Sequence, residues 1–313
     1  MSRSPVPIAE AGSYPVWRRP IALLILMAAG MPLAFATWNA LLNNFVIEAA
    51  HFDGSDIGWL HTVREIPGFL AIGVIAVLMV MREQVLGLVS LILLGVATGL
   101  TAQFPSLGGI LVITMLSSIG FHYYETVNQS LQLQWLPKAR APQMLGWLVA
   151  TGSASTLVIY GVIVLLWEPL NLSYNMVFLA AGGATTLIAL FCLLAYPQFD
   201  SPTPQTKKLI LRRRYWLYYA LQFMAGARRQ IFVVFAGFMM VERFGFEVHE
   251  VTSLFLINLV INMIAAINTR AVREGERSRI ARYSGRNSSS LSYLAVFFRW
   301  KGLVRWVFIM SPP

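Results

Sequence analysis

The sequence predicts an all-α, polytopic membrane helical bundle. Hydrophobic residues make up 57% of its 313 residues and charged residues only 12%, whereas a soluble domain carries about 25% charge. The mean hydropathy is +0.63. The apolar residues form eight long stretches, and most of these are long enough to cross roughly 30 Å of hydrocarbon as a helix. The stretches are 20–46, 57–81, 85–103, 109–134, 144–167, 176–196, 215–241 and 251–267.

The gaps between the stretches alternate in charge, which predicts the topology. The N-terminal tail 1–19, every second gap after it and the segment after the eighth stretch are basic, with Arg3, Arg18, Arg19, Arg82, Lys138, Arg140, Lys207, Lys208, Arg212, Arg213, Arg214, Arg270, Arg273, Arg277, Arg279, Arg282 and Arg286. The other gaps contain Arg243 as their only base and the acids Glu48, Asp53, Asp56, Glu168, Glu242, Glu247 and Glu250. By the positive-inside rule, the basic gaps and the N-terminus face the cytoplasm. We therefore expect an integral membrane protein of a bacterial inner (plasma) membrane.

Composition and motifs argue against several other classes of protein. The net charge is +10, but the bases are spread over short loops, which favours contact with the lipid bilayer over binding to nucleic acid. Cys192 is the single cysteine, which excludes an intrachain disulfide and a cysteine-based metal cluster. The sequence has no nucleotide-binding loop and no H-E-x-x-H or G-x-S-x-G motif. We therefore expect no enzyme activity, no cofactor and no metal site, while the oligomeric state is open.

An internal repeat appears at an offset of 194 residues, without gaps. The segment 52–57 (FDGSDI) aligns with 246–251 (FEVHEV), and each copy is preceded by one long apolar stretch. The charged residues Arg18, Arg19 and Glu48 align with Arg212, Arg213 and Glu242. Duplicated halves are the usual build of secondary transporters.

Six stretches, a basic linker and a repeat of the first stretch together resemble the major facilitator superfamily over about residues 18–268. The basic connection 136–141 (LPKARA) also resembles the family's link between its fourth and fifth helices. The resemblance implies one complete six-helix half and a partial second half. The expected parts are a cytoplasmic N-tail 1–19, a six-helix transmembrane bundle 20–196, a flexible cytoplasmic linker 197–214, two further transmembrane helices 215–268 and an aberrant basic tail 269–313.

The tail 269–313 departs from the repeat. Residues 279–297 should copy the span 85–103, but they contain three arginines and a run of serines. An arginine near the centre of a span costs roughly 2.5–3.5 kcal/mol. The family resemblance implies about four more spans in a full second half. We interpret the chain as a C-terminally truncated or frame-shifted transporter with the break near 266–269; the alternative is a naturally short form.

Ionisable side chains inside the stretches are the best candidates for substrate or proton binding, because such groups are costly at membrane depth. They are Arg64, Glu65, Glu125, Arg228 and Arg229. Glu125 belongs to a polar stripe whose spacing places it on one helical face, which is typical of a surface turned to protein or water. The stripe consists of His122, Glu125, Gln129 and Gln132.

The family resemblance implies that the first, second, fourth, seventh and eighth helices border a central cavity. Asn39 and Asn43 on the first helix and Arg64 on the second join the polar stripe as candidates. The uncharged third and sixth stretches are expected to face lipid. Two alternatives stay open: a static ion pair between Glu125 and an arginine, and interhelical hydrogen bonding by Asn39 and Asn43.

These observations predict a secondary active transporter of a small solute that works by alternating access. Proton coupling is the simplest mechanism, with Glu125 taking up the proton and Arg228 or Arg229 beside it. The two arginines favour an anionic small-molecule substrate. The alternative is an inactive truncated fragment, or a membrane protein that acts through a partner.

Overall fold

The computed structural model describes residues 5–200, 212–221, 224 and 237–261. The chain divides into two compact units, Met1–Leu259 and Val260–Pro313, and the fold given below is that of the first unit. Parts of the seventh and eighth predicted stretches, most of the linker 197–214 and the tail 269–313 lie outside the described residues.

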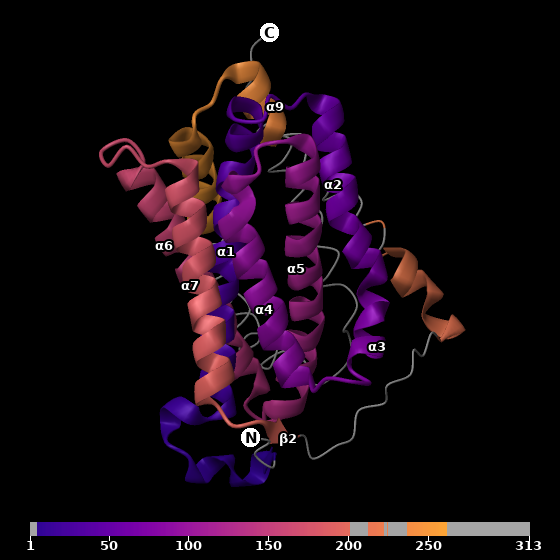
Figure 1. Cartoon of the computed structure of the whole chain (residues 1–313). Coiled ribbons are helices and arrows are strands. Elements are labelled where there is room, and N and C mark those ends of the chain that lie inside the picture. The colour runs from indigo at the N-terminus through magenta and orange to yellow at the C-terminus, as the bar shows by residue number, and fades with distance from the viewer. Residues whose placement is uncertain (1–4, 201–211, 222–223, 225–236, 262–313) are drawn as a thin grey trace, which may run out of the picture. The chain divides into compact units, whose positions relative to one another are not determined.

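Five long helices confirm five of the predicted stretches, and all are long and apolar enough to cross a membrane (Figure 1). They are α1 (Pro20–Glu48), α4 (Glu83–Leu100), α5 (Leu107–Trp135), α6 (Ala141–Leu166) and α7 (Tyr174–Ala195). A 3-10 turn, η4 (Thr101–Gln103), extends α4. The gaps that the charge pattern assigns to opposite sides of the membrane lie at opposite ends of this bundle.

The second predicted stretch, 57–81, is a broken helix rather than one continuous span. It consists of α2 (Gly54–Phe69), the 3-10 turn η3 (Leu70–Gly73) and the short α3 (Val74–Val77). The break follows Pro67, which cannot donate a backbone hydrogen bond and disturbs the preceding turn. At its start, α2 is fixed by a capping box in which Asp53 and Asp56 exchange side-chain and backbone hydrogen bonds.

The N-terminal segment covers one end of the bundle, called the tail end below. It contains β1 (Val6–Pro7), η1 (Ile8–Ser13) and η2 (Val16–Arg18), and β1 pairs in parallel with β2 (Phe199–Asp200) (Figure 1). The Gln84 side chain donates to the Pro197 carbonyl at 2.9 Å and accepts from the Phe199 amide at 2.9 Å. The first residues of the predicted flexible linker 197–214 are thus packed, because a buried amide satisfies their backbone groups.

α4 is the most buried of the five long helices, so the expectation that the third stretch faces lipid is wrong. Buried residues make up 61% of its apolar segment, against 17% in α6 and 33% in α7. α4 packs against α5 on one side and α7 on the other (Figure 1). Its leucines Leu88, Leu91 and Leu94 are almost fully buried.

Small residues allow this packing. A Cβ atom on Gly95 of α4 would lie 2.8 Å from the Gly182 carbonyl oxygen of α7. A Cβ atom on Gly120 of α5 would lie 2.7 Å from the Ser90 carbonyl oxygen of α4. Glycines at such contacts let helix backbones approach closely, which is how helices associate where lipid removes the hydrophobic driving force.

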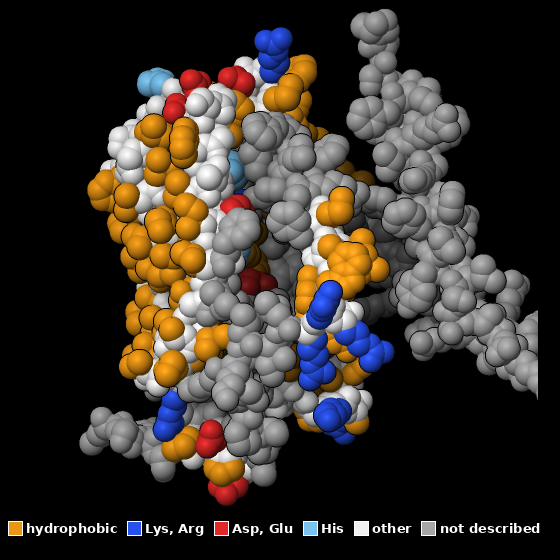
Figure 2. Space-filling model, turned by 90° about the vertical axis from the view of Figure 1, so that its right-hand side faces the viewer, with side chains coloured by type: hydrophobic (Ala, Val, Ile, Leu, Met, Phe, Trp, Pro, Cys, Tyr) orange, Lys and Arg blue, Asp and Glu red, His pale blue; other side chains and the backbone are white. Residues whose placement is uncertain are grey.

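Large hydrophobic side chains on the outside of the bundle are typical of contact with lipid. Trp59 of α2, Val149 of α6 and Leu187 of α7 are each more than half exposed. Figure 2 shows hydrophobic side chains over much of the described surface of one face, between charged side chains near its two ends. This pattern agrees with the predicted membrane location.

The internal repeat is visible at the turn between α9 (Gly237–Phe244) and the helix Val248–Ile261. His51 and Gly245, which are 194 positions apart, both have positive φ, of 55° and 67°. The hydrogen bonds of the two turns also correspond. Phe52 N donates to Val46 O at 3.0 Å, and Phe246 N donates to Met240 O at 3.1 Å.

The same correspondence holds for the cap that opens the next helix. Asp53 N donates to Asp56 Oδ2 at 3.2 Å, and Glu247 N donates to Glu250 Oε2 at 3.0 Å. Matching backbone conformation and matching caps at one constant offset confirm the predicted repeat for this turn. The two copies are linked by Asn44, whose side-chain amide donates to the Phe246 carbonyl at 2.8 Å.

Gly182→Ala should lower the free energy of unfolding by about 1–3 kcal/mol, because the added methyl group would press the α7 backbone away from α4. The neighbouring Gly183 has open space where its Cβ would lie, so Gly183→Ala is the matched control and should leave stability unchanged or slightly improved. Thermal unfolding of the two variants in detergent compares them. Equal stability would contradict the proposed role of the glycine contact.

Candidate functional site

The polar stripe lies on α5, which is one continuous helix as the spacing requires. Ser106 caps it by accepting a hydrogen bond from Gly109 N at 3.2 Å. The opposite face is buried against α1 and α4, where the Tyr124 hydroxyl donates to the Met27 carbonyl of α1 at 2.9 Å. Val127 on that face is also buried. Its Cγ1 would lie 3.1 Å from a Cβ atom added to Gly87 of α4, so the two helices are in close contact there.

The four stripe residues are therefore turned away from the α1–α4 core. Gln129 is exposed, whereas His122, Glu125 and Gln132 are half-buried. The Gln129 side chain lies within hydrogen-bonding reach of the Glu125 carboxylate one helical turn away. The Gln129 amide can donate a hydrogen bond to the charged carboxylate of Glu125 and accept one from its protonated form.

The break in α2 packs against α5 beside this stripe. A Cβ atom on Gly68 would lie 3.0 Å from Cε1 of His122, so the glycine leaves room for the imidazole. Arg64 and Glu65 are close enough to His122 to interact with it electrostatically. The Ser118 hydroxyl of α5 donates to the Arg64 carbonyl of α2 and fastens the two helices.

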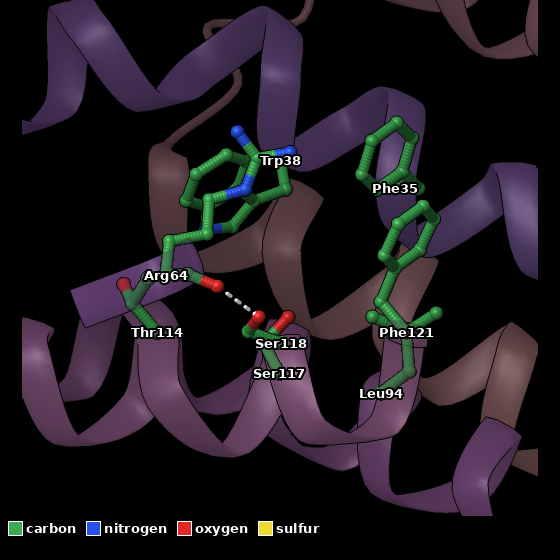
Figure 3. A pocket seen from close by; sticks show the side chains of 8 residues that line it. All are labelled: Phe35, Trp38, Arg64, Leu94, Thr114, Ser117, Ser118 and Phe121. Carbon is green, nitrogen blue, oxygen red and sulfur yellow. Dashed lines mark hydrogen bonds between the residues drawn. The ribbon is translucent and has the colours of Figure 1, made fainter. Parts of the chain in front are cut away.

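A small cavity lies between α1, α2, α4 and α5 (Figure 3). Its walls are Phe35, Trp38, Arg64, Leu94, Thr114, Ser117, Ser118 and Phe121. Phe35 and Phe121 stack with ring centroids 4.5 Å apart and planes 10° apart. The Arg64 guanidinium carbon lies 4.8 Å from the Trp38 ring centroid and 5.7 Å from that of Phe35, which is cation–π geometry.

The cavity walls also carry polar atoms that are buried without a hydrogen-bond partner among the described residues. These atoms are Nε1 of Trp38 and Oγ1 of Thr114. Behind Trp38 lies the buried His61, whose ring centroid is 6.4 Å from that of Trp38 and whose Nδ1 is likewise unpartnered within the described structure. Unpaired buried polar groups are costly, so the cavity offers hydrogen bonds to a molecule of about the size of water.

The two asparagines predicted on α1 lie in different surroundings. Asn39 is half-buried and donates to the Phe35 carbonyl of its own helix at 2.9 Å. Asn43 is buried, and its Nδ2 lies 2.7 Å from where a Cβ on Gly237 of α9 would be. Packing between helices therefore accounts for Asn43, while Asn39 stays a predicted candidate.

Arg228 and Arg229 lie outside the described residues, so an ion pair between either of them and Glu125 stays a prediction. The structure brings Arg64 to the cavity wall and His122 and Glu125 to the adjoining stripe. Sequence reasoning missed Trp38 and His61. A signal was present, because Phe35 and Trp38 on α1, and His61 and Arg64 on α2, are each three residues apart and so share a helical face.

No family model and no curated protein matches the sequence. Solved structures do match. A mutant of the nucleoside transporter NupG superposes with a TM-score of 0.63 at 14% identity, covering 85% of this chain and 69% of the other. Another structure of the nucleoside transporter NupG gives a TM-score of 0.60 at 15% identity, covering 81% and 68%. The POT family transporter PepTSo gives 0.46 at 18% identity, covering 78% and 55%.

At such identities the similarity defines the fold. The chain shares the fold of the nucleoside transporter NupG over most of its length, which agrees with the transporter fold predicted from the repeat and the topology. The all-α polytopic bundle expected from the sequence is confirmed.

If the stripe faces water rather than lipid, a cysteine at Gln129 should react with a water-soluble maleimide on the order of tenfold faster than one at Val127, because thiolate forms only where water reaches it. The buried Cys192 is first replaced by alanine to give a cysteine-free background. Labelling rates of the two single-cysteine variants in intact membranes give the answer. An unreactive cysteine at 129 would show that the stripe is turned to lipid or packed by protein.

Proposed function

We propose that this chain acts as a secondary transporter that moves a small solute across a bacterial inner membrane by alternating access. The observation that carries the proposal is the repeated turn, with its paired positive-φ residues and caps, at the end of a six-helix bundle of major facilitator type. Repeated halves that can rock against each other are the basis of alternating access in such folds.

The tail end of the bundle faces the cytoplasm in this proposal. It carries the basic gaps, including Arg82, Lys138 and Arg140, whereas Glu48, Asp53 and Glu168 lie at the opposite end. The positive-inside rule supports this orientation. The N-terminus is then cytoplasmic, and the acidic turns are extracytoplasmic.

The cavity chemistry supports a substrate that combines a flat ring with hydrogen-bonding groups. Phe35, Phe121 and Trp38 could contact a planar ring, and the Thr114 hydroxyl and Trp38 N–H could bind its polar substituents, once the site opens. In the present structure Phe35 and Phe121 stack on each other, and the cavity has room for about one water molecule. One solved structure with this fold is that of the nucleoside transporter NupG. We infer that nucleosides are the first substrate class to test.

Arg64 gives the cavity one positive charge, but its guanidinium already lies over two aromatic rings. A neutral or weakly anionic solute therefore fits this wall better than a strongly charged one. The anionic substrate predicted from the sequence depends on Arg228 and Arg229, which would have to supply the remaining positive charge.

Glu125 is the proposed proton carrier. Glu125 is half-buried within the span, and a proton that neutralises its carboxylate lowers the cost of burying it. The change between inward-facing and outward-facing conformations would then cost less in the protonated form. Its neighbours Gln129 and His122 keep hydrogen-bonding capacity in both states. Uptake would then be driven by an inward proton gradient.

Glu125→Gln should abolish uptake driven by a pH gradient, because the amide cannot exchange a proton. The assay measures accumulation of labelled uridine in proteoliposomes, with and without an acidic exterior. Glu242→Gln removes an exposed carboxylate at the end of α9 and should transport normally. Full pH-driven uptake by Glu125→Gln would remove this residue from the coupling mechanism, and the absence of uridine uptake by the unmutated chain would contradict the substrate class.

A further inference from the structure

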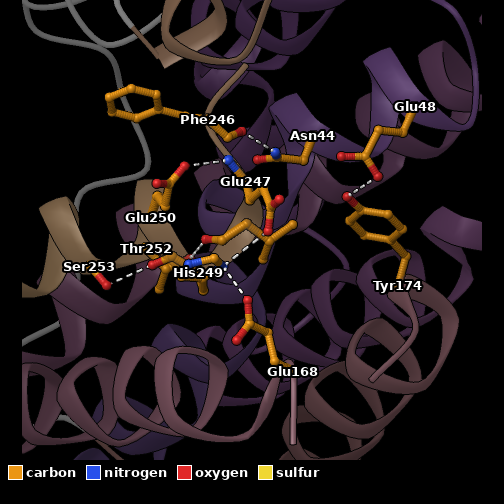
Figure 4. A network of polar contacts seen from close by, with 11 residues as sticks. Asn44, Glu48, Glu168, Tyr174, Phe246, Glu247, His249, Glu250, Thr252 and Ser253 are labelled. Atoms are coloured by element: carbon orange, nitrogen blue, oxygen red, sulfur yellow. Dashed lines mark hydrogen bonds and ion pairs between the residues drawn. The ribbon is translucent and has the colours of Figure 1, made fainter. Parts of the chain in front are cut away.

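Three metal-ligating side chains meet at the end of the bundle opposite the tail end (Figure 4). Glu168 comes from the connection between α6 and α7, and Glu247 and His249 come from the start of the helix Val248–Ile261. Nδ1 of His249 lies 3.5 Å from Oε1 of Glu168 and 3.4 Å from Oε2 of Glu247. One ligand atom of each residue lies within 4.8 Å of the other two.

These spacings are longer than direct hydrogen bonds but suit atoms that share a metal ion. An N–H···O bond spans about 2.7–3.2 Å. Donor atoms around a four-coordinate zinc ion, with metal–ligand bonds of about 2.0–2.2 Å, lie roughly 3.3–3.6 Å from one another. The imidazole nitrogen therefore stands at a coordination distance, not a hydrogen-bonding distance, from both carboxylates.

Nδ1 of the His249 imidazole makes no other polar contact within the described residues. Nδ1 of His249 is buried and has no hydrogen-bond partner within the described residues. Its only polar contacts there are the ion pairs with Glu168 and Glu247, although 31% of the side chain is exposed. Both contacts are longer than a usual hydrogen bond, and an ion placed between the three groups would replace them with coordination bonds.

The backbone holds all three residues in place. Glu168 begins a tight turn in which its carbonyl accepts from Asn171 N at 3.0 Å, and Asn171 has a φ of 47°. Glu247 N is capped by Glu250, and the His249 carbonyl accepts from the Ser253 hydroxyl at 2.7 Å. The carboxylates themselves are about two-thirds exposed, at 67% and 68%, so they are free to rotate onto an ion.

We propose that Glu168, Glu247 and His249 form a binding site for a divalent transition-metal cation, with Zn²⁺ as the best fit. One imidazole and two carboxylates with an open fourth position match zinc chemistry, whereas Ca²⁺ takes six to eight oxygen ligands. The sequence predicts no metal site, because it has no metal-ligand spacing such as H-E-x-x-H; Glu168 is far from the other two ligands in the chain. The corresponding position to His249 in the first repeat is Ser55, so the site belongs to the second copy alone.

A bound ion would tie the α6–α7 connection of the first six helices to the first turn of the helix Val248–Ile261. Such a link would resist separation of these two segments. This consequence follows from the positions of the ligands and needs no assumption about the transported solute.

The test is titration of Zn²⁺ into the purified full chain, without a polyhistidine tag, followed by isothermal calorimetry. We expect one ion per chain, and the site should also bind Co²⁺ with the visible absorption of a four-coordinate ion. His249→Ala should weaken Zn²⁺ binding by roughly tenfold or more. His51→Asn is the matched control: it removes an exposed histidine from the equivalent turn, and asparagine tolerates the positive φ there.

A second variant, Glu168→Gln with Glu247→Gln, keeps the histidine and the shape of both side chains but removes the two anionic ligands. It should lose binding as His249→Ala does, which guards against a folding defect in the alanine variant. Absence of Zn²⁺ binding by the unmutated chain would overturn the proposal and leave a direct contact between imidazole and carboxylates. Equal binding by the unmutated chain and the double variant would also overturn it.

Discussion

The close approach of α4 to α5 and α7 sets the geometry of everything around it. Glycines on each side of the contact bring helix backbones together where a single methyl group would not fit, at Gly95 and Gly182 and again at Gly120. In a membrane such contacts replace the hydrophobic driving force that holds soluble bundles together. Because α5 is pressed onto α4, its face with Tyr124 is buried and its polar stripe is turned outward.

The candidate site depends on a second constraint, the break in α2. Pro67 lies in the last turn of α2, just before the 3-10 turn η3, and Gly68 leaves room for the His122 ring of α5. The hydrogen bond from Ser118 to the Arg64 carbonyl then fixes α2 so that Arg64 lies over Trp38. Close packing on one side of α5 and a broken helix on its other side together leave a cavity with aromatic walls and unpaired polar atoms.

Much of the fold could be predicted from the sequence, because span length, loop charge and a constant repeat offset report directly on membrane topology. The turn that begins with His51 has the same backbone hydrogen bonds as the turn that begins with Gly245. The role of α4 could not be predicted in this way. An uncharged apolar stretch has the same composition whether it faces lipid or other helices. The residues that its glycines contact become known only from the structure.

The site was predictable in part for a similar reason. The α5 stripe follows from spacing within one helix, so the common face of His122 and Glu125 could be predicted, while their role in binding stays a prediction. Trp38, His61 and the group of Glu168, Glu247 and His249 depend on contacts between segments far apart in the chain. Phe199 shows the same limit, because a Pro- and Ser-rich linker looks flexible until a buried Gln84 is seen to bind its backbone.

If the chain is a carrier whose site opens to the two sides in turn, it must catalyse counterflow of its substrate. Proteoliposomes containing the purified chain are loaded with unlabelled uridine and placed in a trace of labelled uridine, with no pH gradient. A carrier exchanges the two pools, so labelled uridine should accumulate transiently above its equilibrium level inside the proteoliposomes. Simple equilibration without that overshoot, as through a channel, or no entry beyond that of protein-free liposomes, would contradict alternating access.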